Sequence, residues 1–485
     1  MRYRFALTLA AFFAASPFSA GAQTLTQLAH QPPTGAIITM QMTDGTVMAQ
    51  GGNENDWWQL TPDITGSYQN GTWKQLASLP NGYEPYAMAE AVLADGRLVI
   101  SGGEYNFGQF AFTNQSAIYD PLANTWTMID PPKGWTNIGD APSIVLPDGR
   151  FVIGYKFATK MAALDPATLA WSPLTSTGKN GIIAEEGWVL LPDGTFLTVD
   201  VKAHPKSERY YPNSGIWFDE GDTATVDLRG PQNCCGRCIE YGPKNKCYNP
   251  PGETGGSMRR PDGTVFATGA TPDGQSTAHT AIWTPPAKGK QGTWTAGPDF
   301  PNGDQAADSP VSILPNGNVL VEGVSGTLYE FDGTHLNPEM SAGGNELMPL
   351  PTGEVLVGGT AVYKSTGTYN AAWAPTISTS PASVTRGQTY QIAGTQFNGL
   401  NQGGAFGDEF DTHTNYPLVR ITNTKTGHVF YCRTHDHSTM GVATGSKTVT
   451  TNFDVPTGME TGAGTLVVVA NGIPSTAVAV TVTVN

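Results

Sequence analysis

Short apolar runs alternate with polar turn segments along the chain, from residue 24 almost to its end. Seven segments share one pattern, in which a turn dipeptide precedes a strand of alternating or wholly apolar residues. The first turn residues are Asp44, Asp95, Asp148, Asp193, Asp262, Asn316 and Thr352. Asp-Gly and Asn-Gly favour tight hairpins because both residues tolerate the left-handed conformation. We therefore expect seven β-hairpins and few helices.

Tryptophans extend this repeat. A tryptophan follows most of the turns, as in NGTWKQL, ANTWTMI and GTWTAGP, often after a segment such as IYDPLANTW. Four strands in a unit of about 50 residues are typical of a β-propeller blade. The repeats resemble those of the kelch family over residues 24–373, and this resemblance implies seven blades around a central axis.

The two ends of the repeat array complement each other. The last unit lacks a normal fourth strand, whereas TLTQLAHQPP at 24–33 is similar to the strand that follows a tryptophan, as in WKQLASLP. We predict that residues 24–30 complete the last blade, which would hide an otherwise exposed sheet edge.

The pattern changes at Ala374 to PTISTSPASVTRGQTYQIAG, and alternating strands continue to the end. Such strands favour an immunoglobulin-like β-sandwich over 374–485, and its opening resembles TIG-type domains. The predicted fold is therefore all-β, with a seven-bladed kelch-type β-propeller over 23–373 followed by this sandwich. That order resembles the architecture of galactose-oxidase-like proteins.

The first 22 residues have the features of a signal peptide, with Arg2 and Arg4 before an apolar run and small residues before Gln23. We expect export to the periplasm or the outside of the cell, with no later segment that spans a membrane. Loss of Arg2 and Arg4 leaves 24 basic against 41 acidic residues, a net charge of −17. This charge disfavours nucleic acid as a partner, and we expect a monomer.

One end of the propeller should carry the loops that precede the first strands and follow the second strands, opposite the Asp-Gly turns. Acidic residues recur in these loops, at Asp140, Glu185, Glu186, Glu253, Asp308 and Glu346. They either form an acidic pocket or accept hydrogen bonds from backbone N–H groups at strand starts.

Aromatic residues share this end, including the loop EYNFGQFAF at 104–112 and the candidate ligand-binding residues Trp57, Trp58, Tyr86 and Trp135. Rings beside carboxylates suit carbohydrate, which offers an apolar face and hydroxyl groups. The alternative is that packing between blades uses these rings.

The resemblance to galactose oxidases implies a copper ion held by two tyrosines and two histidines, with one tyrosine crosslinked to a cysteine. This chain departs from that pattern. Ala307 and Asp308 stand where the family has a Tyr-His pair, and no cysteine lies in the early blades. The architecture is therefore expected without the copper-radical reaction.

The segment THDHS offers another candidate metal site. In a strand, His435 and His437 would project to one side, and with Asp308 they would supply mixed nitrogen and oxygen ligands for a transition metal such as copper or zinc. Alternatively, the two histidines pin one domain to the other. The loop GDEFDTHTNYP, with Asp408, Glu409, Asp411 and His413, either holds calcium or is simply solvated.

Four of the five cysteines lie in NCCGRCIEYGPKNKC. Export favours two disulfides among them, with the pairing left open between Cys234, Cys235, Cys238 and Cys247. Cys432 is then either a buried free thiol or a metal ligand beside His435.

Three functions are compatible with these features. The first is a secreted propeller that binds an extracellular carbohydrate or another small ligand. The second is an enzyme, either an oxidoreductase with a metal at His435 and His437 or a glycan-cleaving hydrolase or lyase with Glu185 and Asp308 as acid and base. The third is a protein-binding scaffold, which export disfavours.

Overall fold

The computed structural model describes residues 23–183, 186–223, 226–229, 240–242, 246–248, 253–271, 277–287, 291–344, 346–407 and 411–484. Within these ranges the fold is all-β, and the helical elements are the short 3-10 turns η2 (Pro301–Gly303) and η3 (Ala371–Trp373). No helix in them is long and apolar enough to cross a membrane. The predicted signal peptide, residues 1–22, lies outside the described residues.

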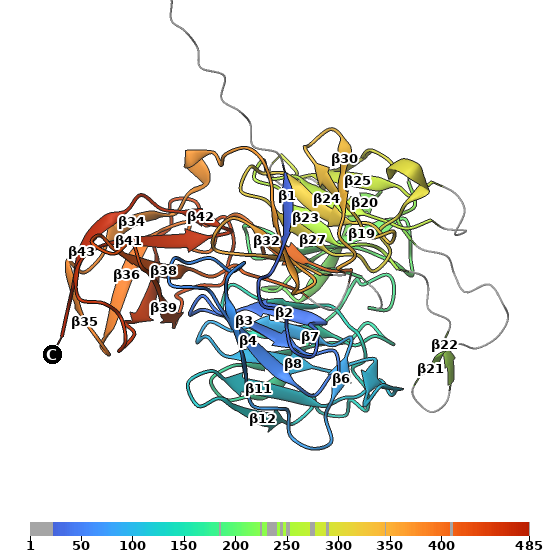
Figure 1. Ribbon diagram of the computed structural model, residues 1–485. Helices are drawn as coiled ribbons and strands as arrows, with labels where there is room; N and C mark the ends of the chain where they lie inside the picture. Colours follow the sequence, from blue (N-terminus) through green and yellow to red (C-terminus); the bar gives the residue numbers. More distant parts are fainter. Residues whose placement is uncertain are drawn as a thin grey trace, which may run out of the picture.

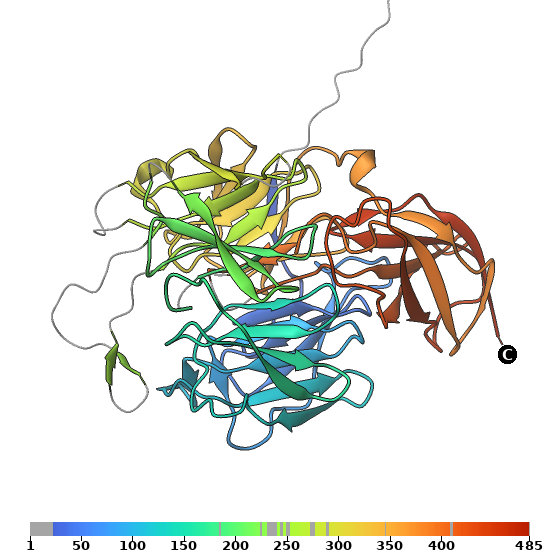
Figure 2. The ribbon, with the colours of Figure 1, turned by 180° about the vertical axis from the view of Figure 1, so that it is seen from behind.

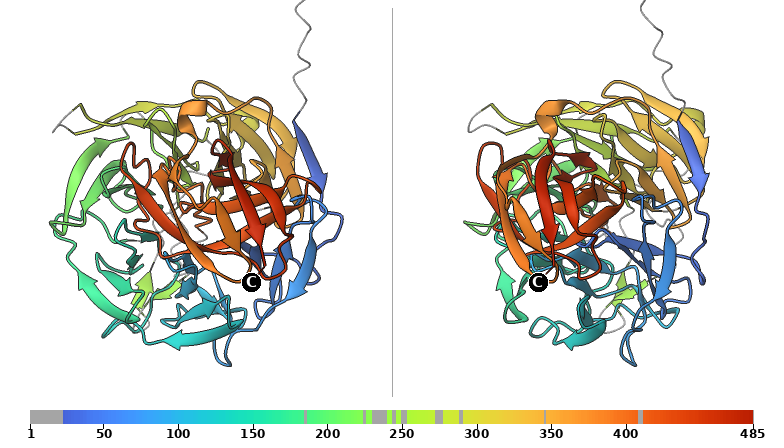
Figure 3. Two further views of the ribbon diagram at one scale, coloured as in Figure 1. Left: turned by 90° about the vertical axis from the view of Figure 1, so that its left-hand side faces the viewer. Right: turned by 60° about the vertical axis from the view of Figure 1, so that its left-hand side comes forward.

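Seven antiparallel sheets stand around a common axis in the described part of the chain, six with four strands and one with a fifth strand, β37 (Gly404–Ala405) (Figure 3). The first strands of most neighbouring sheets contact one another, which places these strands nearest the axis. A turn with one of the predicted dipeptides joins the first and second strands, as where Gln41 pairs with Val47 across Asp44. The seven predicted hairpins are therefore confirmed, and their turns lie at one end of the ring, here called the turn end.

Sheets 1 to 3 follow the sequence order. Sheet 1 contains β2 (Ile38–Gln41), β3 (Val47–Gln50), β4 (Trp57–Thr61) and β5 (Thr72–Gln75). Sheet 2 contains β7 (Ala89–Val92), β8 (Leu98–Ser101), β11 (Ser116–Asp120) and β12 (Thr125–Ile129). Sheet 3 contains β13 (Ser143–Val145), β14 (Phe151–Gly154), β15 (Met161–Asp165) and β16 (Ala170–Leu174).

Sheets 4 to 6 continue in the same way. Sheet 4 contains β17 (Val189–Leu190), β18 (Phe196–Val199), β19 (Lys206–Tyr211) and β20 (Ile216–Asp222). Sheet 5 contains β23 (Ser257–Arg259), β24 (Val265–Thr268), β25 (Thr280–Thr284) and β26 (Thr293–Ala296). Sheet 6 contains β27 (Val311–Ile313), β28 (Val319–Glu322), β29 (Thr327–Phe331) and β30 (Leu336–Ser341).

Sheet 7 joins the two ends of the ring. It contains β31 (Leu347–Pro349), β32 (Val355–Val357) and β33 (Ala361–Lys364), and its fourth strand is β1 (Thr24–Gln27). β1 pairs antiparallel with β33, with Thr24 opposite Lys364. The prediction that the segment from residue 24 completes the last sheet is therefore confirmed.

Burial explains the composition of the strands. Every residue of β3, β8 and β14 is buried, because neighbouring sheets cover both faces, so these strands are apolar runs rather than alternating ones. The fourth strands β5 and β12 expose most of their residues. In β12, Trp126 packs against Trp57 of sheet 1 and Tyr119 of its own sheet, with ring centroids 5.0 and 5.1 Å apart. The repeated tryptophan therefore packs one sheet against the next.

The strands that follow Ala374 form a separate C-terminal sheet system of nine strands in the described residues. They are β34 (Thr376–Thr379), β35 (Ser383–Thr385), β36 (Thr389–Thr395), β38 (Leu418–Asn423), β39 (Val429–His435), β40 (Val449–Asp454), β41 (Gly462–Ala470), β42 (Ile473–Pro474) and β43 (Val478–Thr483). This system has its own apolar core, which includes Ile392, Val419, Phe453 and Leu466.

The C-terminal strands pack on the turn end of the ring. The backbone N–H groups of Thr434, His437 and Met440 donate to the carbonyls of Thr43, Ala94 and Pro147, at 3.1, 3.2 and 3.1 Å. These three carbonyls belong to the turns of sheets 1, 2 and 3. Figures 1 and 2 show the C-terminal strands, in orange and red, on one side of the ring.

Two stretches of the C-terminal region, residues 401–407 and 411–416, contact the first strands of the ring. Their strand β37 (Gly404–Ala405) pairs antiparallel with β27 of sheet 6. The side chain of Gln402 accepts a hydrogen bond from the N–H of Leu190 in sheet 4 at 2.6 Å, and Thr412 donates to the carbonyl of Leu347 in sheet 7 at 3.2 Å. We call residues 401–407 and 411–416 together the axial segment.

Two small sheets lie at the opposite end of the ring, which we call the mouth. One contains β6 (Pro85–Tyr86), β9 (Tyr105–Asn106) and β10 (Gln109–Phe110), and the other pairs β21 (Glu240–Gly242) with β22 (Lys246–Tyr248). In Figure 1, β6 and the β21–β22 pair lie on the right, and the C-terminal strands lie on the left. The mouth is therefore not covered by the C-terminal strands.

Candidate functional site

An aromatic hairpin, residues 105–110, is the main feature of the mouth. Tyr105 lies 5.9 Å from Tyr86 and 5.9 Å from Phe110, measured between ring centroids, and Phe110 lies 4.4 Å from Phe112. Phe107 and Phe110 are 48% and 42% exposed. The hairpin therefore presents two large apolar rings to solvent beside a packed row of aromatic side chains.

The turn of this hairpin is conformationally strained. Phe107 and Gly108 both have positive φ angles, of 55° and 64°, as a tight two-residue hairpin turn requires. A bulky residue in this left-handed region costs about 1 to 2 kcal/mol, whereas glycine accepts it freely. The side chain of Glu54 accepts a hydrogen bond from the N–H of Gly108 at 3.0 Å and ties the turn to sheet 1.

A buried lysine lies beneath the hairpin. Lys156 is fully buried, and its Nζ lies 2.5 Å from Oδ1 of Asp140, 3.8 Å from Oε1 of Glu104 and 5.0 Å from the ring centre of Phe112. Burial, with the nearby Glu104 carboxylate, raises the pKa of Tyr105 to about 12. Asp140 therefore forms a buried ion pair rather than an exposed acidic subsite, which corrects the prediction for this residue.

A second buried lysine, Lys179, forms an ion pair with Glu186. Nζ of Lys179 lies 2.6, 2.9 and 3.1 Å from the carboxylates of Glu208, Asp200 and Glu186, and all four side chains are fully buried. Burial raises the pKa of Glu186 to about 8 against the charge of Lys179, and the Asp200 carboxylate adds to this rise. One lysine therefore neutralises only part of a three-carboxylate cluster. Glu186 is a buried packing group, which corrects its predicted role in ligand binding.

Glu346 is also buried, at 3% exposure. Its Oε1 accepts a hydrogen bond from the N–H of Thr39 at 2.5 Å, which links sheet 7 to sheet 1, and its Oε2 has no hydrogen-bond partner among the described residues. Burial raises the pKa of Glu346 to about 8. The alternative that these acids bond backbone groups at strand starts therefore fits Glu346.

The remaining predicted acids differ in exposure. Glu253 is half-buried and Asp308 is exposed, with a positive φ of 42°. Glu185 lies outside the described residues, so the proposed acid–base pair of Glu185 and Asp308 stays a prediction.

The four predicted aromatic residues also differ in exposure. Trp57 is fully buried against Trp126, and Trp135 is 9% exposed and packs edge-on against Tyr155 at 5.0 Å. Trp58 is half-buried and donates from Nε1 to Oγ1 of Thr34 at 2.8 Å. Packing between sheets therefore accounts for Trp57 and Trp135, whose predicted role in ligand binding is corrected.

Tyr86 is the predicted aromatic residue that joins the exposed group at the mouth. The sequence indicated the loop EYNFGQFAF but not which of its rings are exposed. An aromatic residue immediately before the glycine of a two-residue turn, as in Phe107-Gly108, was the available signal.

The predicted metal ligands do not meet. β39 ends at His435, and Asp436 has a positive φ of 52°, so the alternation that would place His437 on the same side is broken. Both histidines lie at the turn end of the ring, where the N–H of His437 bonds the carbonyl of Ala94, whereas Asp308 precedes β27 at the mouth. His435, His437 and Asp308 therefore cannot share one ion.

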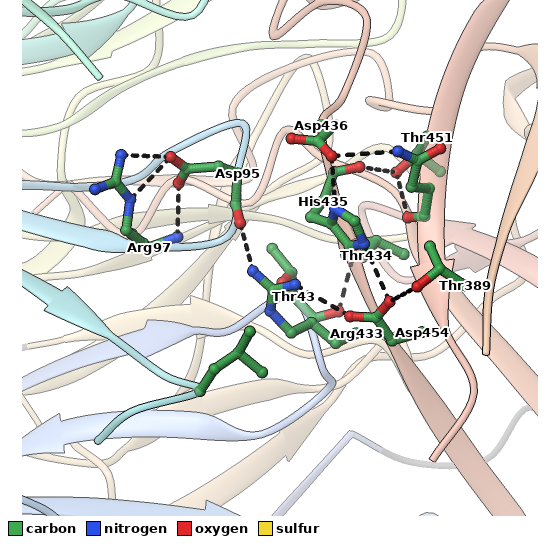
Figure 4. Close-up of polar contacts among 12 residues, drawn as sticks. Thr43, Asp95, Arg97, Thr389, Arg433, Thr434, His435, Asp436, Thr451 and Asp454 are labelled. Atoms are coloured by element: carbon green, nitrogen blue, oxygen red, sulfur yellow. Dashed lines mark hydrogen bonds and ion pairs between the residues drawn. The ribbon is translucent and has the colours of Figure 1, made fainter. Parts of the chain in front are cut away.

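Each histidine has other partners, and Figure 4 shows those of His435. Nδ1 of His435 lies 2.7 Å from Oδ2 of Asp436, and its Nε2 lies 3.2 Å from Oδ1 of Asp454. His437 is buried, its Nδ1 lies 2.8 Å from Oγ1 of Thr451, and burial lowers its pKa to about 3. His437 is therefore neutral at ordinary pH.

Arg433 links this group to the ring. Its Nη2 donates to the carbonyl of Asp95 at 2.6 Å, and its Nη1 lies 3.2 Å from Oδ2 of Asp454 (Figure 4). The contacts around THDHS therefore favour the alternative in which this segment pins the two parts of the chain together.

The axial segment brings other polar groups into the ring. The side-chain amide nitrogen Nε2 of Gln402 lies 2.8 Å from Nε2 of His413, which in turn lies 3.3 Å from Oδ1 of Asp411. Burial raises the pKa of Asp411 against the nearby His413. Asp408 and Glu409 lie outside the described residues, so the calcium site predicted for this loop stays a prediction.

No group of three or more His, Cys, Asp and Glu side chains is arranged to hold a metal ion within the described ranges. The start of β27 carries Ala307 and Asp308 in place of a Tyr-His pair, and the THDHS histidines lie at the far end of the ring. The residues therefore do not fit the copper site that the galactose-oxidase resemblance implies.

Cys432 is buried, is not in a disulfide, and has a pKa raised by burial. It therefore behaves as a buried free thiol, the first of its two predicted alternatives. The side chains of Cys234, Cys235, Cys238 and Cys247 lie outside the described residues, and their two disulfides stay a prediction.

No family model and no curated protein matches the chain by sequence. Among solved structures, the chain is similar to a fungal alcohol oxidase of the AA5 family in complex with copper, with a TM-score of 0.51 and 12% identity over 96% of this chain and 99% of that one. It also matches a streptogramin B lyase, with a TM-score of 0.45 and 11% identity over 71% of this chain and 98% of that one.

A third match is the extracellular domain of a hybrid two-component system from B. thetaiotaomicron, with a TM-score of 0.47 and 9% identity over 96% of this chain and 59% of that one. At these identities the similarity concerns the fold alone. Together with the ring of sheets, the alcohol oxidase match establishes a propeller-type all-β fold.

Proposed function

We propose that the chain is an exported, monomeric β-propeller protein that binds an extracellular carbohydrate at its mouth. In this proposal residues 23–373 form a seven-bladed kelch-type propeller and residues 374–485 an immunoglobulin-like domain. The aromatic hairpin is the ligand-binding element.

The observation that carries this proposal is Phe107, whose ring is exposed and whose backbone has a left-handed conformation. Folding would favour glycine at a left-handed position, and it would favour a polar residue at a surface that is 48% exposed. A residue that is unfavourable on both counts is explained by contact with a ligand. Sugar rings stack their C–H faces on such side chains.

The surroundings of the hairpin add polar groups. The Glu54 carboxylate accepts a hydrogen bond from the N–H of Gly108, and the backbone carbonyl of Glu84 accepts one from the N–H of Phe107. The Glu84 carboxylate accepts a hydrogen bond from the side chain of Asn55. A neutral saccharide stacked on Phe107 and Phe110 would meet these carboxylates with its hydroxyl groups.

The test is isothermal titration calorimetry against a panel of neutral oligosaccharides, with the variant Phe107→Gly. We expect at least tenfold weaker binding, together with an unfolding free energy higher by about 1 kcal/mol, because glycine relieves the left-handed strain. Weaker binding together with higher stability of Phe107→Gly would show that Phe107 contacts the ligand, whereas a packing role predicts lower stability.

Leu169→Gly is the matched control, since Leu169 also has a positive φ, of 54°, but lies in the β15–β16 turn. It should leave saccharide binding unchanged. Unchanged binding by Phe107→Gly, or no binding of any saccharide by the wild type, would refute the proposal.

A further inference from the structure

A cavity of about 590 Å³ opens between sheets 4 and 5 at the turn end of the ring. It lies beside the turns that begin at Asp193 and Asp262, so it is on the opposite end from the aromatic hairpin. A second cavity, of about 270 Å³ between sheets 3 and 4, shares Asp193 and Tyr211 with the first. The two cavities therefore adjoin and form one groove across three sheets, which we call the turn-end groove.

The charged groups of the larger cavity are paired, with one exception. Asp193 and Glu220 both contact the guanidinium of Arg209, and Asp219 lies 4.0 Å from Nζ of Lys206. Arg259 lines the same cavity and has no carboxylate within 4.0 Å among the described residues. The charge of Asp262 acts on Arg259 from a longer distance, while its carboxylate lies 2.9 Å from the guanidinium of Arg260.

Arg259 is also nearly buried, at 9% exposure. Its Nη1 donates to the carbonyl of Leu400 at 2.6 Å, which fixes the guanidinium against the C-terminal strands. Burial lowers the pKa of Arg259. A buried cation that contacts no carboxylate carries a desolvation cost, and an anion that enters the cavity would reduce this cost. Guanidinium groups match carboxylates in particular, because they can donate two parallel hydrogen bonds.

Aromatic side chains form another wall of the groove. Tyr211 and Phe218 contact edge-to-face with ring centroids 5.1 Å apart, and Phe218 is 50% exposed. Trp283 also lines the cavity, and its buried Nε1–H has no hydrogen-bond partner within the described residues. The groove thus combines a surface for stacking with a cation that contacts no carboxylate.

We propose that the turn-end groove is a second binding site, for an oligosaccharide that carries carboxylate groups, such as an oligouronate. Phe218 and Tyr211 stack on the C–H face of one sugar residue, and Arg259 binds the carboxylate. The length of the groove across three sheets suits a chain of sugars rather than a monosaccharide. This site is independent of the neutral-saccharide site proposed at the mouth.

The test is calorimetric titration of the full chain with a trigalacturonate and with its methyl ester, which lacks the charge. We expect saturable binding of the acid that weakens with added salt, and at least tenfold weaker binding of the ester. Arg259→Gln and Phe218→Ala should each weaken binding of the acid at least tenfold, while Arg259→Lys should retain part of it. Phe218 is exposed, so its variant keeps the test valid if Arg259→Gln fails to fold.

Phe107→Gly, at the mouth, serves as the control and should bind the acid as the wild type does. Equal affinity for acid and ester, no binding of the acid, or unchanged binding by Phe218→Ala would overturn the proposal. Full competition by sodium acetate at the same carboxylate concentration would also overturn it, because the site would then recognise an anion without the sugar.

Discussion

Replacement of Glu346 by glutamine should stabilise the protein at neutral pH. Glu346 joins sheet 7 to sheet 1 through the N–H of Thr39, and burial raises its pKa from 4.5 to about 8. Between these two pH values the unfolded state releases a proton that the folded state keeps. Folding stability therefore decreases as pH rises from 4.5 to 8 and is constant above 8.

The magnitude follows from this shift. Each pH unit in this window lowers the unfolding free energy of the wild type by up to about 1.4 kcal/mol. At pH 7 the unfolding free energy is therefore about 3 kcal/mol lower than at pH 4.5. Glutamine resembles the protonated carboxyl group and does not titrate. Its amide N–H atoms have no acceptor at the position of Oε2, which offsets about 1 to 2 kcal/mol of the gain at every pH. The variant should therefore be the more stable protein at pH 8 and the less stable one at pH 4.5.

The assay is urea unfolding, followed by tryptophan fluorescence, at half-unit steps from pH 4.5 to 8.5. Glu354→Gln is the matched control, because Glu354 is a half-buried carboxylate of the same sheet that accepts a hydrogen bond from Thr352 at 2.9 Å. A difference between Glu346→Gln and wild type that does not change with pH would refute the reasoning. Calorimetric titration of Glu346→Gln with saccharides tests the predicted role in ligand binding, since a buried structural group should not alter saccharide affinity.

Two further perturbations test other buried groups. Burial lowers the pKa of His437 to about 3. Below pH 6.5 the unfolded state therefore binds a proton that the folded state does not bind. The free energy of unfolding should fall by about 2 kcal/mol as the pH is lowered from 6.5 to 5. His437→Gln should flatten this part of the pH profile in urea unfolding, and an unchanged slope would show that other groups cause the acid sensitivity. Lys179→Met leaves three buried carboxylates without their cation and should destabilise the protein by about 3 to 5 kcal/mol in calorimetry. Lys133→Met, at an exposed lysine, should change stability by less than about 0.5 kcal/mol, and an equally small effect of Lys179→Met would contradict the cluster's role.

The ring could be predicted because its signals are local. Turn dipeptides such as Asp44-Gly45 fix the hairpins, the repeated tryptophans mark the fourth strands, and the similarity of residues 24–33 to such a strand indicated the closure by β1. Each of these signals depends on residues that are close in sequence.

The candidate site was harder to predict because its contacts join distant loops. The register of the repeats correctly identified Asp140 and Glu186 as residues near the strand starts, but nothing in the sequence indicated that Lys156 and Lys179 neutralise them. The prediction for THDHS failed at Asp436, where one left-handed residue ends the alternation of the strand.

The closure of the ring by β1 constrains the order in which the protein is made and folded. β1 pairs with β33, about 340 residues later in the chain, so the first strand to be synthesised has no partner until the last sheet of the ring exists. The axial segment is synthesised later still and contacts the first strands of several sheets. A nascent chain can therefore build single sheets one after another, but the finished ring with the axial segment forms only after synthesis has passed residue 416.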